Sequence, residues 1–130
     1  MKPTICIDFD GVINNYESGY GPHYRVDYIP DEPVEGTKGA IKKLRHKFKV
    51  VVQSTRCADP DGKQAIIDWL DFYGIEVDDV VAHKPPAVMY IDDRGIQFRG
   101  DWAATLRSVE EFKHWLFGNT WDTIGYGGKK

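Results

Sequence analysis

Side chains that could bind a metal ion and a phosphate group follow four short apolar segments of this sequence. They are Asp8-Phe9-Asp10-Gly11, Ser54-Thr55-Arg56, His83-Lys84-Pro85 and Asp92-Asp93-Arg94. If the four apolar segments are strands of one parallel sheet, their carboxyl ends line a single edge, which is where such sheets bind ligands. The spacing therefore predicts one cleft that combines carboxylates, a hydroxyl group and a lysine.

The clustered carboxylates predict a divalent cation in this cleft. Four negative charges so close together cannot all remain ionised without compensation. Mg²⁺ prefers oxygen ligands and is commonly held by one or two carboxylates together with a substrate phosphate. We expect the side chains of Asp8 and Asp92 and the main-chain carbonyl of Asp10 to be inner ligands, while Asp93 holds a metal-bound water or the adjoining loop.

The same residues could hydrolyse a phosphate ester. Alternate residues of an extended segment point the same way, so Asp8 and Asp10 can both face a phosphoryl group. Asp8 would attack the phosphorus and form an aspartyl phosphate. Asp10 would protonate the leaving oxygen and later deprotonate the attacking water, and Lys84 would balance the negative charge of Asp8 and the phosphate.

Phosphate binding is expected from the main chain as well as from side chains. The Ser54 hydroxyl and nearby backbone N–H groups would bind phosphoryl oxygens, and Gly11 lets the backbone approach the phosphate closely. Thr55 and Arg56 follow Ser54, which makes them further candidates for substrate binding. An arginine at the protein surface explains position 56 equally well.

The elements that must position these residues alternate between strands and helices. Continuous apolar runs predict strands at residues 4–9, 49–53, 77–82 and 87–91. Because runs of this kind are typical of strands covered on both faces, we predict an α/β fold with a central parallel sheet in a three-layer α/β/α sandwich.

Three helices are predicted from apolar spacing and end signals. The first covers residues 36–48, and the second begins at Pro60 and ends at Gly74, where glycine suits a left-handed cap. Ser108-Val109-Glu110-Glu111 matches a capping box, which predicts the start of a third helix. We expect the apolar residues Phe112, Trp115 and Leu116 of this helix to face the core. Trp102 and Trp121 are expected in the core as well.

The order of the motifs resembles that of the haloacid dehalogenase (HAD) superfamily of phosphatases. Its four motifs match DFDGV at residues 8–12, Ser54-Thr55-Arg56, Lys84-Pro85 and IDD at residues 91–93. The resemblance implies a Rossmann-like core, Mg²⁺ as cofactor, and these roles: Asp8 nucleophile, Asp10 general acid and base, Ser54 phosphate binder, Lys84 charge stabiliser, Asp92 metal ligand and Asp93 support. Phosphatases of the superfamily keep the second aspartate of the first motif, so Asp10 implies phosphate-ester hydrolysis.

The resemblance also implies a member without a large cap domain, because little beyond the predicted helices separates the motifs. The loop of residues 14–36 is the candidate for a minimal lid. Capless members tend to act on macromolecules or exposed phosphate ends, or to close the site by forming oligomers. The implied partners are therefore a phosphorylated small molecule or an exposed phosphate end, on a nucleotide, a nucleic acid or a sugar, and a second copy of the chain.

Structural explanations remain open for most of these residues. Asp8 and Asp10 could be turn residues, Ser54 a helix cap and Lys84 a surface lysine, while Asp93 could cap the loop or pair with Arg94. Aromatic and basic residues of the long loop could stack on a base or sugar and hold a second phosphate, or could simply fix the loop to the core: Tyr16, Tyr20, His23, Tyr24 and Arg25.

At the level of function, the alternatives are a non-catalytic phosphate- or partner-binding module and a phosphoacceptor signalling domain. Neither of these needs a proton donor at Asp10, which favours the enzyme.

Composition limits the remaining classes of function. The 130 residues fit one domain, with residues 125–130 as a frayed tail. A net charge of −3 gives no basic surface for duplex nucleic acid. Cys6, expected in the core, and Cys57 do not make a disulfide framework. No stretch approaches the ~20 apolar residues of a membrane span, so we expect a cytoplasmic protein without a membrane partner.

Overall fold

The computed structural model describes residues 1–19, 21–114 and 118–119, and the chain forms two compact units. The first unit is Met1–Asp92 and the second is Asp93–Lys130. The boundary falls within the Asp92-Asp93 pair. The expectation of one domain over the whole chain stays a prediction.

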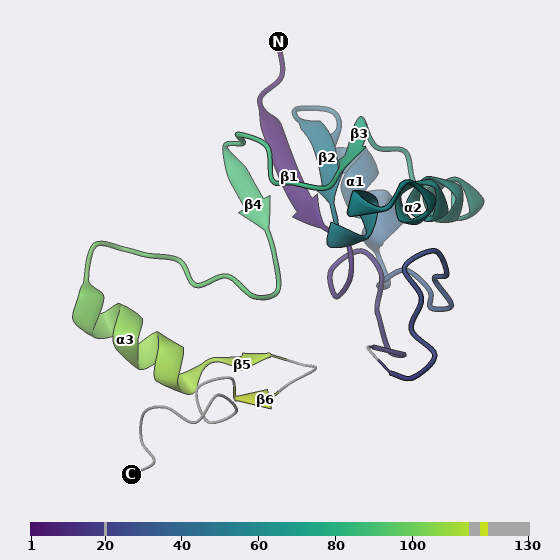
Figure 1. The fold of residues 1–130 in the computed structure, drawn as a ribbon. Helices are drawn as coiled ribbons and strands as arrows, with labels where there is room; N and C mark the ends of the chain where they lie inside the picture. The colour runs from purple at the N-terminus through teal and green to yellow at the C-terminus, as the bar shows by residue number, and fades with distance from the viewer. Residues whose placement is uncertain (20, 115–117, 120–130) are drawn as a thin grey trace. The chain divides into compact units, whose positions relative to one another are not determined.

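A four-stranded parallel sheet forms the centre of the first unit (Figure 1). Its strands are β1 (Thr4–Asp8), β2 (Lys49–Gln53), β3 (Asp79–Val81) and β4 (Met89–Ile91), in the order β3-β2-β1-β4. All neighbouring strands are parallel, and Cys6 of β1 lies opposite Val51 on one side and Tyr90 on the other. The predicted α/β fold with a parallel sheet is confirmed.

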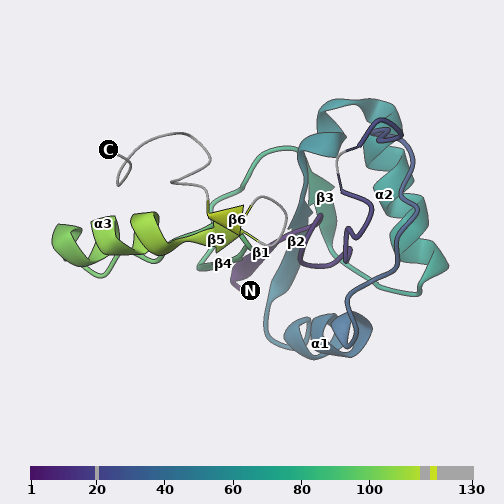
Figure 2. The same ribbon diagram turned by 90° about the horizontal axis from the view of Figure 1, so that it is seen from below.

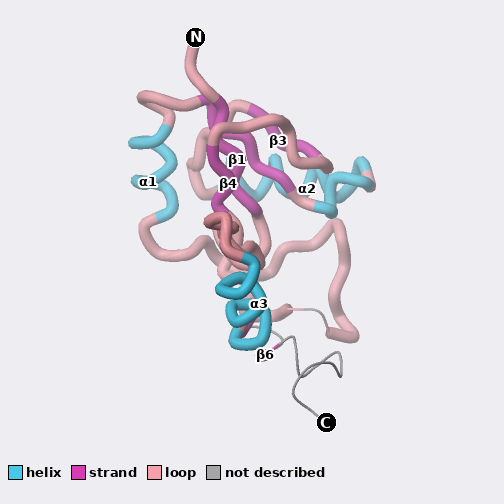
Figure 3. The backbone as a smooth tube through the Cα atoms, turned by 90° about the vertical axis from the view of Figure 1, so that its left-hand side faces the viewer, coloured by secondary structure: helices cyan, strands magenta, loops and turns pink. Residues whose placement is uncertain are grey.

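Helices cover both faces of this sheet. Helix α1 (Thr37–Leu44) and helix α2 (Pro60–Phe72) lie on opposite sides of the strands, as Figures 2 and 3 show from two directions. Strands β1 and β2 are consequently buried on both faces: Ile5, Cys6, Ile7, Val50, Val51 and Val52 are each at most 3% exposed. Burial of one such side chain contributes about 1.5–3 kcal/mol, which explains why the central strands are continuous apolar runs.

Local signals set the ends of α2. The Asp59 side chain accepts a hydrogen bond from the Asp61 N–H, and Pro60 occupies the first helical position. Gly74 follows the helix with φ 68°, so the predicted left-handed glycine is confirmed. A short 3₁₀ helix, η1 (Thr55–Ala58), lies between β2 and α2 and was not predicted.

The long loop of residues 14–36 lies beyond the carboxyl ends of the strands and beside α2 (Figures 1 and 2). Its described residues form isolated bridges, which join Asn14 to Asp10 and Pro33 and join Arg25 to Tyr28. The indole N–H of Trp69 in α2 donates to the Asp31 carbonyl at 2.9 Å. Asn14 near the start of the loop and Asp31 near its end thus attach it to the core.

The second unit contains helix α3 (Trp102–Glu111) and the antiparallel pair β5 (Lys113–His114) and β6 (Gly118–Asn119). The predicted helix start at Ser108 is wrong, because Asp101 caps a helix that already begins at Trp102. The Asp101 carboxylate accepts from the Ala104 N–H at 3.2 Å, and Phe112 is extended. Trp102 is 68% exposed, so its predicted core position is also wrong.

Several predictions made for the end of the chain fall outside the described residues. They concern Trp115, Leu116, Trp121 and residues 125–130. Among the residues that are described, no helix is both long enough and apolar enough to cross a bilayer.

Candidate active site

The strand order reverses between β1 and β4. From β1 the chain moves outward to β2 and β3, and then returns to the opposite side of β1 to form β4. Open parallel sheets bind ligands beyond the carboxyl ends of their strands at such a reversal. Asp8 is the last residue of β1 and Asp92 directly follows β4, so both acids stand at this point.

Three carboxylates meet at the reversal. One carboxylate oxygen from each of Asp8, Asp92 and Asp93 lies within 4.8 Å of the other two. Asp93 is the first residue of the second unit and is joined to Asp92 by the peptide bond. An all-oxygen donor set of this kind fits a hard divalent cation such as Mg²⁺ or Ca²⁺ better than a soft transition metal. The fold therefore brings together three of the four acids that the sequence predicts to share a cleft, Asp8, Asp92 and Asp93.

Lys84 joins this acidic cluster from the segment that follows β3. Its Nζ donates to Asp92 Oδ2 at 2.8 Å, and it lies 5.5 Å from the centre of the Tyr90 ring. The hydrogen bond to Asp92 raises the pKa of Lys84, and the charges of Asp92 and Asp8 raise it further against partial burial. Lys84 is therefore a protonated ammonium group at neutral pH, about half exposed.

Asp10 makes a separate set of contacts. Its Oδ1 accepts from the Asn14 side-chain amide at 2.9 Å, and its Oδ2 accepts from Arg56 Nε at 2.9 Å. Both carboxylate oxygens are thus held in place, while the side chain stays 22% exposed and open to a ligand. The main-chain carbonyl of Asp10 as a metal ligand stays a prediction.

Arg56 is buried, so the alternative that it is an ordinary surface arginine is wrong. Only 1% of its side chain is exposed. The Tyr24 ring lies 4.9 Å from the guanidinium carbon. Nη1 of Arg56 donates to three main-chain carbonyls of the long loop, those of Arg25, Val26 and Tyr28. The three carbonyls share the two N–H groups of Nη1 while Nε donates to Asp10, and Arg56 thereby ties the loop to Asp10.

The remaining predicted phosphate binders lie at the turns after β1 and β2. Ser54 is buried, and its Oγ accepts from the Arg56 N–H at 3.1 Å, so Ser54 does cap η1. A hydroxyl that accepts still has its own proton to donate, which leaves a phosphate-binding role open. Thr55 is exposed at the start of η1. Gly11 has φ 91°, a left-handed conformation that favours glycine.

Asn14 is a site residue that the sequence did not reveal. It is fully buried, its amide holds Asp10, and its Oδ1 accepts from the Tyr16 N–H at 3.3 Å. The sequence does not single it out, because two asparagines, Asn14 and Asn15, follow Val12-Ile13. The turn from Phe9 to Asn14 sets its position, because the N–H groups of Ile13 and Asn14 both donate to the Phe9 carbonyl.

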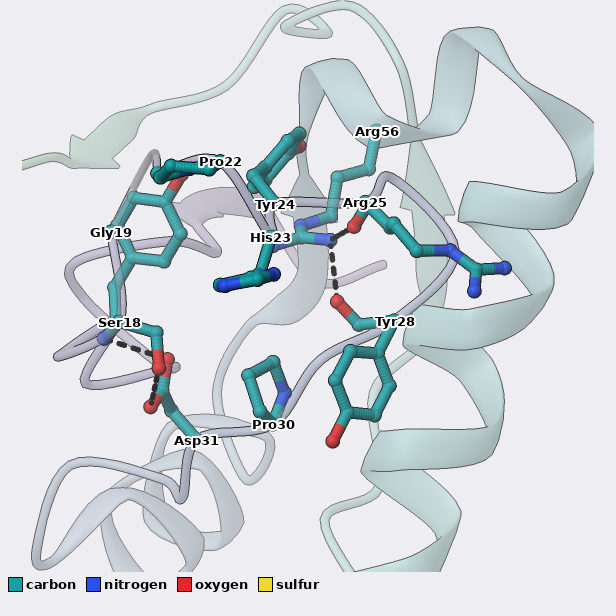
Figure 4. A pocket seen from close by; sticks show the side chains of 12 residues that line it. Ser18, Gly19, Pro22, His23, Tyr24, Arg25, Tyr28, Pro30, Asp31 and Arg56 are labelled. Atoms are coloured by element: carbon teal, nitrogen blue, oxygen red, sulfur yellow. Dashed lines mark hydrogen bonds between the residues drawn. The ribbon is translucent and has the colours of Figure 1, made fainter.

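The long loop also encloses a pocket of about 440 Å³ (Figure 4). Aromatic rings and prolines dominate its lining, with a few polar groups: Tyr16, Ser18, Gly19, Gly21, Pro22, His23, Tyr24, Arg25, Tyr28, Pro30, Asp31 and Arg56. Tyr20, another candidate from the sequence, lies outside the described residues. Arg56 thus contacts Asp10 and also lines the pocket.

Neither the scan against protein-family models nor the search of curated proteins found a match to this chain. Its function is therefore inferred from the chemistry of the site. That site combines three clustered carboxylates, a protonated lysine and a separately held carboxylate at the reversal point of a parallel sheet.

Proposed function

We propose that this chain is a magnesium-dependent phosphomonoester hydrolase that acts through an aspartyl phosphate. One observation carries the proposal: Asp8 and Asp92, from the two strands that flank the reversal, share a carboxylate cluster in which Lys84 pairs with Asp92. The proposal includes a Rossmann-like core of the HAD type, without a large cap domain. The strand order β3-β2-β1-β4, with a helix on each face, supports it.

The donor set indicates how a metal ion would be held. Mg²⁺ would bind the carboxylates of Asp8, Asp92 and Asp93 and the main-chain carbonyl of Asp10. Bound there, it would neutralise phosphoryl charge and polarise the phosphoryl oxygens. Lys84 would add a fixed positive charge, because its pairing with Asp92 keeps it protonated.

In the first step, a carboxylate oxygen of Asp8 attacks the phosphorus. A new bond forms between this oxygen and phosphorus, and the bond from phosphorus to the leaving oxygen breaks. A protonated Asp10 gives its proton to the leaving oxygen, so that an alcohol departs. The hydrogen bonds from Asn14 and Arg56, which fix the orientation of the Asp10 carboxyl, support this role.

In the second step, water hydrolyses the aspartyl phosphate. Asp10, now a carboxylate, takes a proton from the water while the water oxygen attacks the phosphorus. The bond between phosphorus and the Asp8 oxygen breaks, which releases inorganic phosphate and restores both acids. Ser54, Thr55 and the N–H groups near Gly11 would bind phosphoryl oxygens in both steps. Most of the rate enhancement would come from positioning and charge stabilisation.

Hydrolysis of p-nitrophenyl phosphate tests the proposal. We expect turnover that requires Mg²⁺, stops on chelation and returns when Mg²⁺ is added. Asp8→Asn should lower kcat by about 10³-fold or more, because the nucleophile is lost. Asp71→Asn, at an exposed position of α2, makes the same chemical change away from the site and should retain activity.

Three results would count against this function. Full turnover by Asp8→Asn would mean that Asp8 is not the nucleophile. Full turnover in the presence of chelator would mean that the reaction does not need a metal ion. A folded protein that turns over no member of a broad panel of phosphate esters, including 3′- and 5′-phosphorylated oligonucleotides, would instead indicate a phosphate- or partner-binding module.

A further inference from the structure

We propose that the pocket of the long loop binds the nucleobase of a phosphorylated nucleoside, so that the substrates of this site are nucleoside phosphates. The inference rests on the proposed phosphomonoesterase and narrows its substrate class. It follows from where the pocket lies, which groups line it and how its walls are held.

The pocket lies next to the position of the leaving group. In the proposed reaction the leaving oxygen is at Asp10, and Asp10 Oδ2 is 2.9 Å from Arg56 Nε. The Arg56 side chain is also part of the pocket wall. Only the Arg56 side chain therefore separates Asp10 from the pocket, which puts the pocket within reach of a leaving group whose oxygen lies at Asp10.

The lining of the pocket suits a flat aromatic ring. In Figure 4, His23 lies with Pro22 and Tyr24 on one side of it and with Tyr28 and Pro30 on the other. Aromatic side chains stack on any nucleobase, because every base has a π-face. A sugar without a base would instead need many directed hydrogen bonds, and this pocket presents mainly carbon surface.

The charges of the pocket disfavour a second phosphate, which the sequence had left open. Arg25 is already paired with a carboxylate, with Nε and Nη2 at 3.0 and 2.9 Å from the two oxygens of Asp27. The Asp31 carboxylate is on the pocket wall and accepts from both the N–H and the hydroxyl of Ser18. A neutral ring that carries hydrogen-bonding edges fits this lining better than an anion.

The walls are fixed before any ligand arrives. Arg56 holds three carbonyls of the loop, and Trp69 holds the Asp31 carbonyl. Tyr16, buried in the lining, has φ 56°, a left-handed backbone that a tyrosine adopts only where its surroundings impose it. A preformed pocket loses little conformational freedom on binding, which favours affinity.

The pocket is also of a suitable size. Its volume of about 440 Å³ lies in the range of roughly 300–1,000 Å³ that is usual for small-molecule sites. It can hold a base with part of its ribose.

Substrates with and without a base test this inference: 5′-AMP and ribose 5-phosphate carry the phosphate at the same position, and 3′-AMP carries it at another. We would measure kcat/KM for 5′-AMP and 3′-AMP against ribose 5-phosphate, with Mg²⁺ present. Since stacking of one base is worth roughly 5- to 150-fold, at least one of the two nucleotides should exceed ribose 5-phosphate by such a factor. Tyr28→Ala and His23→Ala should reduce that ratio, while Phe72→Ala, an exposed aromatic on α2 away from the pocket, should leave it unchanged.

The results separate this inference from the proposed function. Equal kcat/KM for the three esters would overturn the base pocket while leaving the phosphatase intact. A nucleotide preference that survives both pocket substitutions, in variants with wild-type circular dichroism, would also overturn it. Absence of turnover with every ester, p-nitrophenyl phosphate included, would overturn the phosphatase, and the assignment of a leaving-group pocket would fall with it.

Discussion

Arg56 Nε and Asp10 Oδ2 lie 2.9 Å apart, and this ion pair joins the long loop to the site. The carboxylate stays partly exposed, whereas the guanidinium is almost completely buried. The same guanidinium binds three loop carbonyls, so one side chain controls both the orientation of Asp10 and the path of the loop.

Replacement of Arg56 should therefore be costly to stability. Arg56→Met removes the donor to Asp10 Oδ2 and to three carbonyls of the loop, and we expect the free energy of unfolding to fall by about 3–5 kcal/mol. Urea denaturation measures this change. The control Arg25→Met removes a pair that is exposed to solvent, and a much smaller loss is expected. Equal losses in the two variants would contradict the structural role of Arg56.

Metal affinity should respond in opposite directions to two substitutions in the acidic cluster. Asp92→Asn removes a charged ligand and should weaken Mg²⁺ binding by about tenfold or more. Lys84→Met removes the ammonium that pairs with Asp92, so Mg²⁺ should bind more tightly even though turnover falls. Calorimetric titration with Mg²⁺ measures both effects without any substrate. Weaker binding to Lys84→Met would show that Lys84 does not compete with the metal for Asp92.

Ser54 should have a structural role that can be separated from its role in catalysis. Ser54→Ala removes the acceptor for the Arg56 N–H, and the loss of this cap should cost about 1 kcal/mol. If Ser54 also binds phosphoryl oxygens, kcat/KM for p-nitrophenyl phosphate should fall in the same variant. Thermal unfolding and kinetics therefore distinguish the two roles, and a loss of stability with unchanged kinetics would leave Ser54 as a cap only.

Asp78 should make stability depend on pH. It accepts from the Val50 N–H at 2.7 Å and from Arg45, and the bond to Arg45 is the main reason that the pKa of Asp78 is lowered. A lowered pKa means that the folded protein binds this proton less readily than the unfolded chain does. The stabilisation by Asp78 is therefore complete above the pKa that this group has in the unfolded chain, about 3.9. It is lost as the pH falls further, through the lower pKa of the folded protein.

The variant Asp78→Asn checks this dependence. At pH 7 it should be less stable than the wild type by about 1 kcal/mol, since the pair with Arg45 is partly exposed. The difference should shrink in denaturation experiments below about pH 4. A difference that stays constant from pH 7 to pH 3 would mean that the charge of Asp78 contributes nothing.

Local chemistry explains what the sequence predicts well. The strand of residues 49–53 is a continuous apolar run, and its bounds match β2. Pro60 and Gly74 mark the ends of α2 because each has a strong conformational preference of its own. The clustering of Asp8 with Asp92 follows from the parallel order of the strands, which the apolar runs predict.

Long-range contacts explain what the sequence does not predict. Arg56 is buried because the loop folds back and presents three carbonyls to it, and no local pattern announces such a contact. Asn14 acquires its role only when the turn after β1 places it against Asp10. The predicted start of α3 is wrong because Ser108 and Asp101 are both good helix caps, and the helix runs without interruption from Trp102, directly after Asp101.

The pairing of Cys6 with Tyr90 has a consequence for synthesis of the chain. Strand β1 emerges first from the ribosome, but its second neighbour β4 arrives only when most of the first unit has been made. Until then the hydrogen-bonding edge of β1 stays open to other chains, a known route to aggregation. Truncated products that stop before Met89 should therefore associate more readily than the longer chain.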